Sequence, residues 1–100
     1  MADVCLYLLG APELEEKLLD RLLMTPVIAT FTSQNAASHG GHPAELDPGE
    51  QVLGRGRAVL VQVLLDERDA QALLADLQQV FAGSRLRYWL CPVLAQGELT

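Results

Sequence analysis

Basic residues are scarce in this sequence, which has seven Lys and Arg against 13 Asp and Glu and a formal charge of −6. No run of Lys or Arg forms the positive stripe that nucleic acid or an anionic membrane surface requires. We therefore expect no nucleic-acid partner.

Long apolar runs are also missing. None approaches the ~20 residues that cross a bilayer, and the N-terminal residues lack the basic stretch and long apolar region of a signal peptide. We therefore expect a cytoplasmic protein with no direct membrane insertion.

Chemically reactive side chains are few. Cys5 and Cys91 are the only cysteines, and each lies in an apolar, strand-like run, where a thiol usually acts as a small buried hydrophobe. The segment Gly10-Ala11-Pro12 offers no thiol pair of the kind that a soft-metal chaperone carries after its first strand. His39 and His42 are the only histidines and lie in a predicted loop, so no nucleophile and base pair is evident. We expect no enzyme.

What remains is a globular composition with half of its 100 residues apolar, which predicts a single domain of residues 1–100. Helical and strand periodicities alternate along the chain. They predict a strand at Val4–Leu9, a helix at Pro12–Met24, strands at Val27–Thr32 and Gly56–Leu65, a helix capped by Asp66 and stopped by Gly83, and a strand at Arg85–Leu94. The order predicts an α+β, ferredoxin-like βαββαβ fold, with a four-stranded antiparallel sheet and both helices on one face.

Strand composition predicts which strands lie at the edge and in the interior of this sheet, and which face is exposed. Pro92 indicates an edge strand, since proline cannot donate to a central ladder, whereas the run Gly56–Leu65 is apolar on both faces and belongs inside the sheet. The face without helices would then expose more apolar surface than soluble monomers usually tolerate. We expect oligomerisation to cover it by packing bare sheet faces together.

The segment 33–54 has no helical or strand period and is unusually long for a loop in a compact domain, which favours a functional or mobile role. It carries His39, His42, Glu45 and Asp47, and imidazole with carboxylate suits a divalent transition metal. The two glycines between the histidines allow both rings to turn toward one point. The alternative is a pair of solvated loop histidines.

A second candidate site binds an anion. Arg55 and Arg57 lie where this segment re-enters a strand, and Ser33 lies where it leaves one. Two guanidiniums beside flexible glycine backbone suit a phosphate or carboxylate, including an adenine nucleotide. The alternatives are arginines paired with nearby acids and a serine that forms a turn.

Several short motifs occur together in an order that resembles a bacterial PII-like signalling family catalogued as a domain of unknown function. They are Leu14-Glu15-Glu16-Lys17-Leu18, Phe31-Thr32-Ser33, His39-Gly40, Glu50-Gln51-Val52, Gly54-Arg55, Leu86-Arg87-Tyr88-Trp89 and Pro92-Val93-Leu94. The resemblance covers nearly the whole chain and implies a ferredoxin-like homotrimer similar to PII and CutA proteins. It also implies that segment 33–54 is the mobile signalling loop and that effectors bind between subunits near Arg55, Arg57 and the last strand.

Genes of this family often lie near heavy-metal efflux pumps, so the resemblance further implies a regulator of metal homeostasis with a membrane efflux pump as partner. The chain departs from typical PII proteins in two places. Phe81-Ala82-Gly83-Ser84 passes directly into the last strand without a Gly-rich, Lys-containing nucleotide loop, and the long loop has no tyrosine. The resemblance therefore does not extend to typical ATP and 2-oxoglutarate sensing or to uridylylation.

Overall fold

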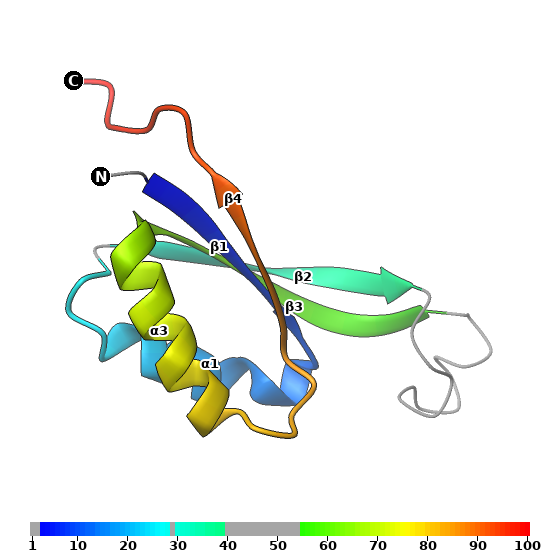
Figure 1. The fold of residues 1–100 in the computed structure, drawn as a ribbon. Helices are drawn as coiled ribbons and strands as arrows, with labels where there is room; N and C mark the ends of the chain where they lie inside the picture. The colour runs from blue at the N-terminus through cyan, green and yellow to red at the C-terminus, as the bar shows by residue number, and fades with distance from the viewer. Residues whose placement is uncertain (1–2, 29, 40–54) are drawn as a thin grey trace.

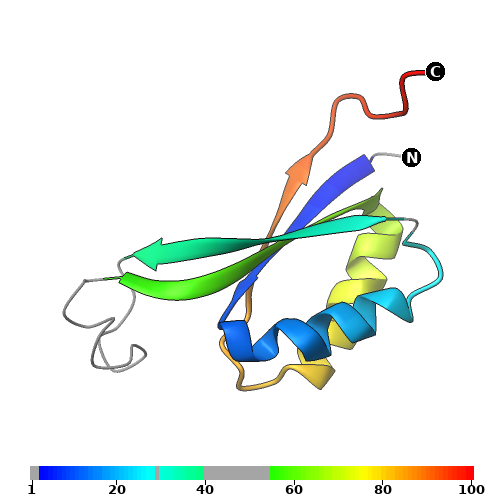
Figure 2. The same cartoon turned by 180° about the vertical axis from the view of Figure 1, so that it is seen from behind.

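The computed structural model describes residues 3–28, 30–39 and 55–100 as a sheet with two helices. The elements are β1 (Asp3–Gly10), a 3-10 turn η1 (Pro12–Leu14), α1 (Glu15–Leu23), β2 (Phe31–His39), β3 (Arg55–Asp66), α3 (Glu67–Val80) and β4 (Arg87–Pro92) (Figure 1). Four strands pair antiparallel in the order β2-β3-β1-β4, and both helices lie on one side of this sheet (Figure 2). The predicted ferredoxin-like fold is confirmed.

The core lies between the helices and one face of the sheet. Alternate residues of the central strands point toward the helices, because successive side chains of a strand face opposite ways. Leu6 of β1 and Val61 and Val63 of β3 are fully buried there. The helices contribute apolar side chains at helical spacing, namely Leu18 and Leu22 of α1 and Ala70, Leu73, Leu74 and Leu77 of α3.

Local sequence signals set the helix ends. Pro12 opens the turn that leads into α1, a position where its missing N–H is not needed. Asp66 caps α3, since its Oδ1 accepts a hydrogen bond from the backbone N–H of Asp69 at 2.8 Å, as the sequence predicts. The two helices are joined by Arg21, whose Nε donates to Asp76 Oδ2 at 2.7 Å.

The second strand differs from its prediction. The strand expected at Val27–Thr32 begins only at Phe31, and residues 33–39, expected as the first part of a loop, continue it to His39. Every residue of β2 has a partner in β3, from Phe31 opposite Val63 to His39 opposite Arg55. A ladder of this kind satisfies the backbone of small polar residues that have no apolar periodicity of their own.

Among the described residues, no helix covers the second face of the sheet, as predicted. Its central and β4 positions include Tyr7, Leu64 and Trp89, which alternate with the core residues. Leu64 is 44% exposed and Trp89 39% exposed, although both are large and apolar. β4 lies at a sheet edge, which confirms the prediction from Pro92.

Candidate functional site

The β2–β3 hairpin carries four of the residues predicted to bind ligands, namely Ser33, His39, Arg55 and Arg57. Its outer half extends past both helices in the two ribbon views (Figures 1 and 2). His39 and Arg55 are direct ladder partners, so the ladder holds the two ends of segment 40–54 side by side. The side chains of Thr32, Ser33, Gln34 and Asn35 are exposed along β2. The hairpin is therefore a polar arm that extends away from the core.

Of the predicted metal ligands, only His39 lies among the described residues. It is the last residue of β2 and its side chain is exposed. His42, Glu45 and Asp47 fall in segment 40–54, outside the described residues. Within residues 3–28, 30–39 and 55–100, no three His, Cys, Asp or Glu side chains form a group suited to a metal ion.

The predicted anion ligands form a line rather than a cluster. Ser33 pairs with Val61, and Arg57 pairs with Ala37, so both side chains lie on the same face of the hairpin. Four ladder positions separate them, about 13 Å at ~3.3 Å per residue, and Asn35 lies between. Arg55 occupies the ladder position opposite His39. Within one chain, this line suits an extended anion more than a single oxyanion.

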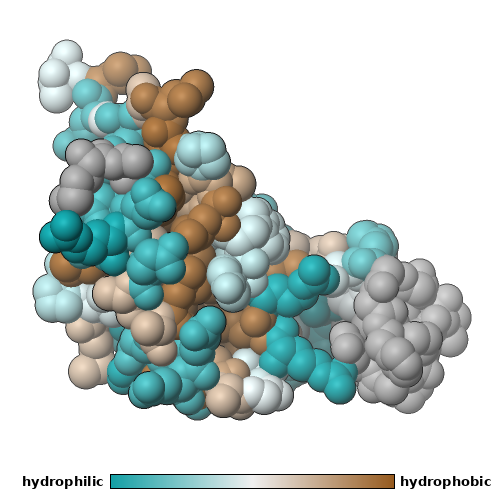
Figure 3. Space-filling view, in the orientation of Figure 1, coloured by the Kyte–Doolittle hydropathy of each residue, from teal (hydrophilic) through white to brown (hydrophobic). Residues whose placement is uncertain are grey.

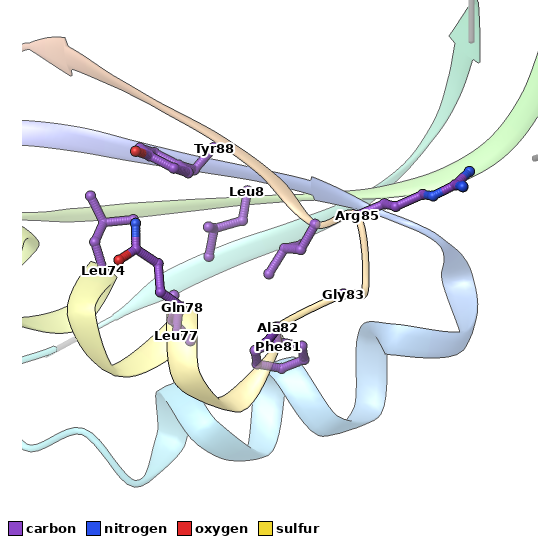
Figure 4. A pocket seen from close by; sticks show the side chains of 10 residues that line it. Leu8, Leu74, Leu77, Gln78, Phe81, Ala82, Gly83, Arg85 and Tyr88 are labelled. Atoms are coloured by element: carbon purple, nitrogen blue, oxygen red, sulfur yellow. The ribbon is translucent and has the colours of Figure 1, made fainter. Parts of the chain in front are cut away.

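The sequence did not predict the pocket between the end of α3 and β4. It has a volume of about 230 Å³, smaller than the ~300–1,000 Å³ of most ligand pockets. In the space-filling view, apolar side chains form a strip from the end of β4 toward the middle of the molecule (Figure 3). Arg85 extends away from the other lining side chains (Figure 4). The pocket is lined by Leu8, Leu74, Leu77, Gln78, Phe81, Ala82, Gly83, Arg85, Leu86 and Tyr88.

Sequence reasoning also missed a thiol pair. Cys5 of β1 and Cys91 of β4 are direct ladder partners, and both are free thiols. Two positions along the same ladder, Tyr7 stacks on Trp89 with ring centroids 5.3 Å apart and planes 7° apart. The sequence did hold a sign that the two cysteines are close, since the predicted fold places the first and last strands, which contain them, side by side. The register that aligns the two cysteines, however, is a property of the folded sheet and has no local signature in the sequence.

The architecture and its projecting hairpin define a class of proteins. The chain is similar in structure to CPII, a nitrogen regulatory PII-like protein from Thiomonas intermedia K12 whose structure holds ADP, AMP and bicarbonate. The TM-score is 0.73 and the sequence identity is 14%, and the match covers 99% of this chain and 98% of CPII. The periplasmic divalent cation tolerance protein CutA from Archaeoglobus fulgidus matches with a TM-score of 0.71 at 10% identity, over 96% and 88% of the two chains. The chain has the fold of PII-like and CutA proteins.

The family is DUF3240, a protein family of unknown function, to which the chain belongs over residues 1–100. A crystal structure of a DUF3240 family protein from Shewanella baltica OS155 matches with a TM-score of 0.82 at 18% identity, covering 100% of this chain and 99% of that one. No curated protein matches the sequence significantly. In the part of the chain that the structure describes, no helix is long and apolar enough to span a membrane.

Proposed function

We propose that this chain is a non-enzymatic regulatory protein of the PII type, which acts through the segment at the tip of the β2–β3 hairpin. The observation that carries the proposal is the hairpin itself, a fully paired ladder whose outer part extends past the helices and ends at His39 and Arg55. In this proposal, the hairpin presents segment 40–54 to a partner protein, and the packing of the core does not change. Ligand binding there would shift the population of its conformations.

The effector in this proposal is a divalent transition metal. His39 ends β2 directly before the segment that contains His42, Glu45 and Asp47. Imidazole and carboxylate ligands suit first-row divalent ions. The shared fold with a protein described as a divalent cation tolerance protein is consistent with this. A role in cytoplasmic metal homeostasis, with a membrane efflux pump as the regulated partner, completes the proposal.

Assembly is part of the same proposal. The uncovered sheet face exposes Leu64 and Trp89, and large apolar side chains in one patch usually mark an interface. We assign this face to contacts within a homotrimer. A partner-docking trimer that binds no small ligand is the alternative if neither metals nor nucleotides bind.

Native mass spectrometry of the full chain, titrated with Zn²⁺, Ni²⁺ and Co²⁺, tests the metal proposal. We expect a trimer that binds one ion per chain, and we expect His39→Ala/His42→Ala to lose the ion but keep the trimer. Arg55→Ala/Arg57→Ala is the matched control and should bind metal normally. Unchanged affinity in the histidine variant would refute the ligand assignment, and a monomer would refute the assembly.

A second candidate function is nucleotide or other anion sensing between subunits. The line formed by Ser33, Asn35 and Arg57 favours it, because an extended anion such as an adenine nucleotide matches its length better than a single phosphate does. CPII, which has the same fold, is described with bound ADP, AMP and bicarbonate. The same titration repeated with ADP and AMP separates the two functions. Loss of nucleotide binding in Arg55→Ala/Arg57→Ala, with normal binding in the histidine variant, would support anion sensing.

A further inference from the structure

The thiol pair Cys5–Cys91 lies on the uncovered face of the sheet. The two residues come from opposite ends of the chain, yet they are direct partners in the β1–β4 ladder. Direct partners present their side chains on the same face, and Cys5 alternates with the core residues Val4 and Leu6. Both thiols are free; Cys5 is buried, and Cys91 is half-buried.

The hydrogen-bond pattern fixes the separation of the two cysteines. Val93 N–H donates to the carbonyl of Asp3 at 3.1 Å, which makes Asp3 and Val93 a hydrogen-bonded pair. Hydrogen-bonded pairs alternate along an antiparallel ladder, so Cys5 and Cys91, two positions further on, form the next one. The Cα atoms of such a pair are about 5.5 Å apart. Their Cβ atoms lie toward the upper end of the ~4.5–5.5 Å range of opposed residues.

This separation suits a bridging ion better than a sulfur–sulfur bond. A disulfide draws the two Cβ atoms to about 3.5–4.5 Å, closer than a hydrogen-bonded pair normally holds them. A linear sulfur–metal–sulfur unit spans about 4.6 Å between sulfurs, twice a metal–thiolate bond of ~2.3 Å. With the Cβ atoms at this separation, side-chain rotation can bring the two sulfurs to the spacing of two-coordinate binding, and thiolate ligands select soft ions such as Cu(I).

Tyr7 supplies a hydrogen-bond donor beside the thiols. Tyr7 follows Cys5 by two residues in β1, so its side chain lies on the same face of the sheet as the two thiols. Trp89 stacks on the Tyr7 ring and limits its movement. A phenol on this face can donate a hydrogen bond to a metal-bound thiolate and partly neutralise the charge that two thiolates bring to the site.

We propose that Cys5 and Cys91 form a two-coordinate thiolate site for a soft monovalent cation of the Cu(I) or Ag(I) type. Binding is an ion exchange without redox change: two thiols release two protons, and the two sulfurs bind one cation. The site does not depend on the metal proposal for the hairpin, because imidazole and carboxylate ligands favour divalent ions and lie on another part of the chain.

The test is an anaerobic titration of the reduced full chain with Ag(I), and with Cu(I) against a chromophoric chelator, read by native mass spectrometry and by ultraviolet metal–thiolate absorption. The ion is added both to native protein and during refolding from urea, so that a neighbouring subunit does not block access. We expect one ion per chain and at least tenfold weaker binding in Cys5→Ser and Cys91→Ser. Tyr7→Phe, which keeps both thiols, should weaken binding severalfold.

His39→Ala/His42→Ala is the matched control and should bind the monovalent ion normally. Loss of Zn²⁺ binding in this histidine variant would bear only on the proposed hairpin site. Either metal-site proposal can therefore be refuted while the other stands. Far-ultraviolet circular dichroism confirms that the serine variants are folded. The proposal is overturned if neither protocol gives uptake, if Cys→Ser variants bind as tightly as wild type, or if mild oxidation joins the thiols in a disulfide while Ag(I) does not bind.

Discussion

Tyr7 and Trp89 stack face to face across the β1–β4 ladder, with 5.3 Å between ring centroids. They lie on the sheet face that has no helix, next to the opposed cysteines. Because Trp89 is the only tryptophan in the sequence, its fluorescence reports directly on this face. Tryptophan fluorescence can therefore follow both the proposed assembly and the proposed cation binding at this face.

An acidic side chain at Leu64 should prevent assembly. Leu64 is 44% exposed on the uncovered face. In the proposed trimer, Leu64→Asp would place a charge in an apolar interface, where desolvation costs on the order of several kcal/mol if the charge has no partner. We expect the variant to be folded but monomeric in size-exclusion chromatography with light scattering. Leu23→Asp, at a residue 72% exposed on α1, makes the same change away from the sheet and should leave assembly intact. A trimer in Leu64→Asp would exclude this face as the interface.

The titration of Tyr7 should respond to Cys5. The hydrogen bond with the Cys5 side chain raises the pKa of Tyr7, and the negative charges of the Cys5 and Cys91 thiolates act in the same direction. We therefore expect Cys5→Ser to bring the Tyr7 pKa back toward its ordinary value. Absorbance of tyrosinate near 295 nm measures it, in a Tyr88→Phe background where Tyr7 is the only tyrosine. An unchanged pKa would mean that the phenol does not sense the thiols.

The Arg21–Asp76 contact should make stability depend on acid pH. Arg21 hydrogen-bonds to Asp76 and lowers the pKa of that carboxyl, while the same contact raises the pKa of Arg21. A carboxyl whose pKa is lower in the folded state stabilises the fold above its unfolded-state pKa, and this contribution is lost as the pH falls through the folded value.

Urea unfolding between pH 7 and pH 2.5 tests this dependence. The free energy of unfolding of wild type should exceed that of Asp76→Asn at neutral pH, and the difference should disappear in acid. The effect should be small, because both side chains are more than a third exposed, at 42% for Arg21 and 37% for Asp76. Asp20→Asn removes the same charge from an exposed position of α1 and is the control. A constant difference at all pH values would contradict the assignment.

The sequence was sufficient to predict the fold because its core elements carry strong periodicities. The continuous apolar run in β3, helical spacing in α1 and α3, and the cap at Asp66 all agree with one topology. Pro92 was likewise a reliable sign of an edge strand. Each of these signals can be recognised within a short stretch of sequence. The apolar ones agree because they pack against the same core.

Features that depend on pairing between distant segments were not predicted. β2 extends through Ser33 to His39 because β3 completes its hydrogen bonds, although its own residues show no strand period. The opposed positions of Cys5 and Cys91 depend on a register that a shift of one residue would destroy. Similarly, the line of Ser33 and Arg57 required the ladder between β2 and β3 to be known.

A side chain at Gly10, the last residue of β1, is expected to destabilise the fold. A Cβ atom there would lie 2.8 Å from Leu86 Cδ1 and 3.3 Å from Leu14 Cδ1, so Gly10→Ala must displace the Leu86 side chain, which also lines the pocket between α3 and β4. We expect a loss of about 1–3 kcal/mol in the free energy of unfolding, the usual cost of overpacking. Gly97→Ala is the control, since a Cβ atom at Gly97 meets nothing within 4 Å. Equal stability of the two variants in urea unfolding would show that Leu86 moves aside without cost and that the base of β4 is loosely packed.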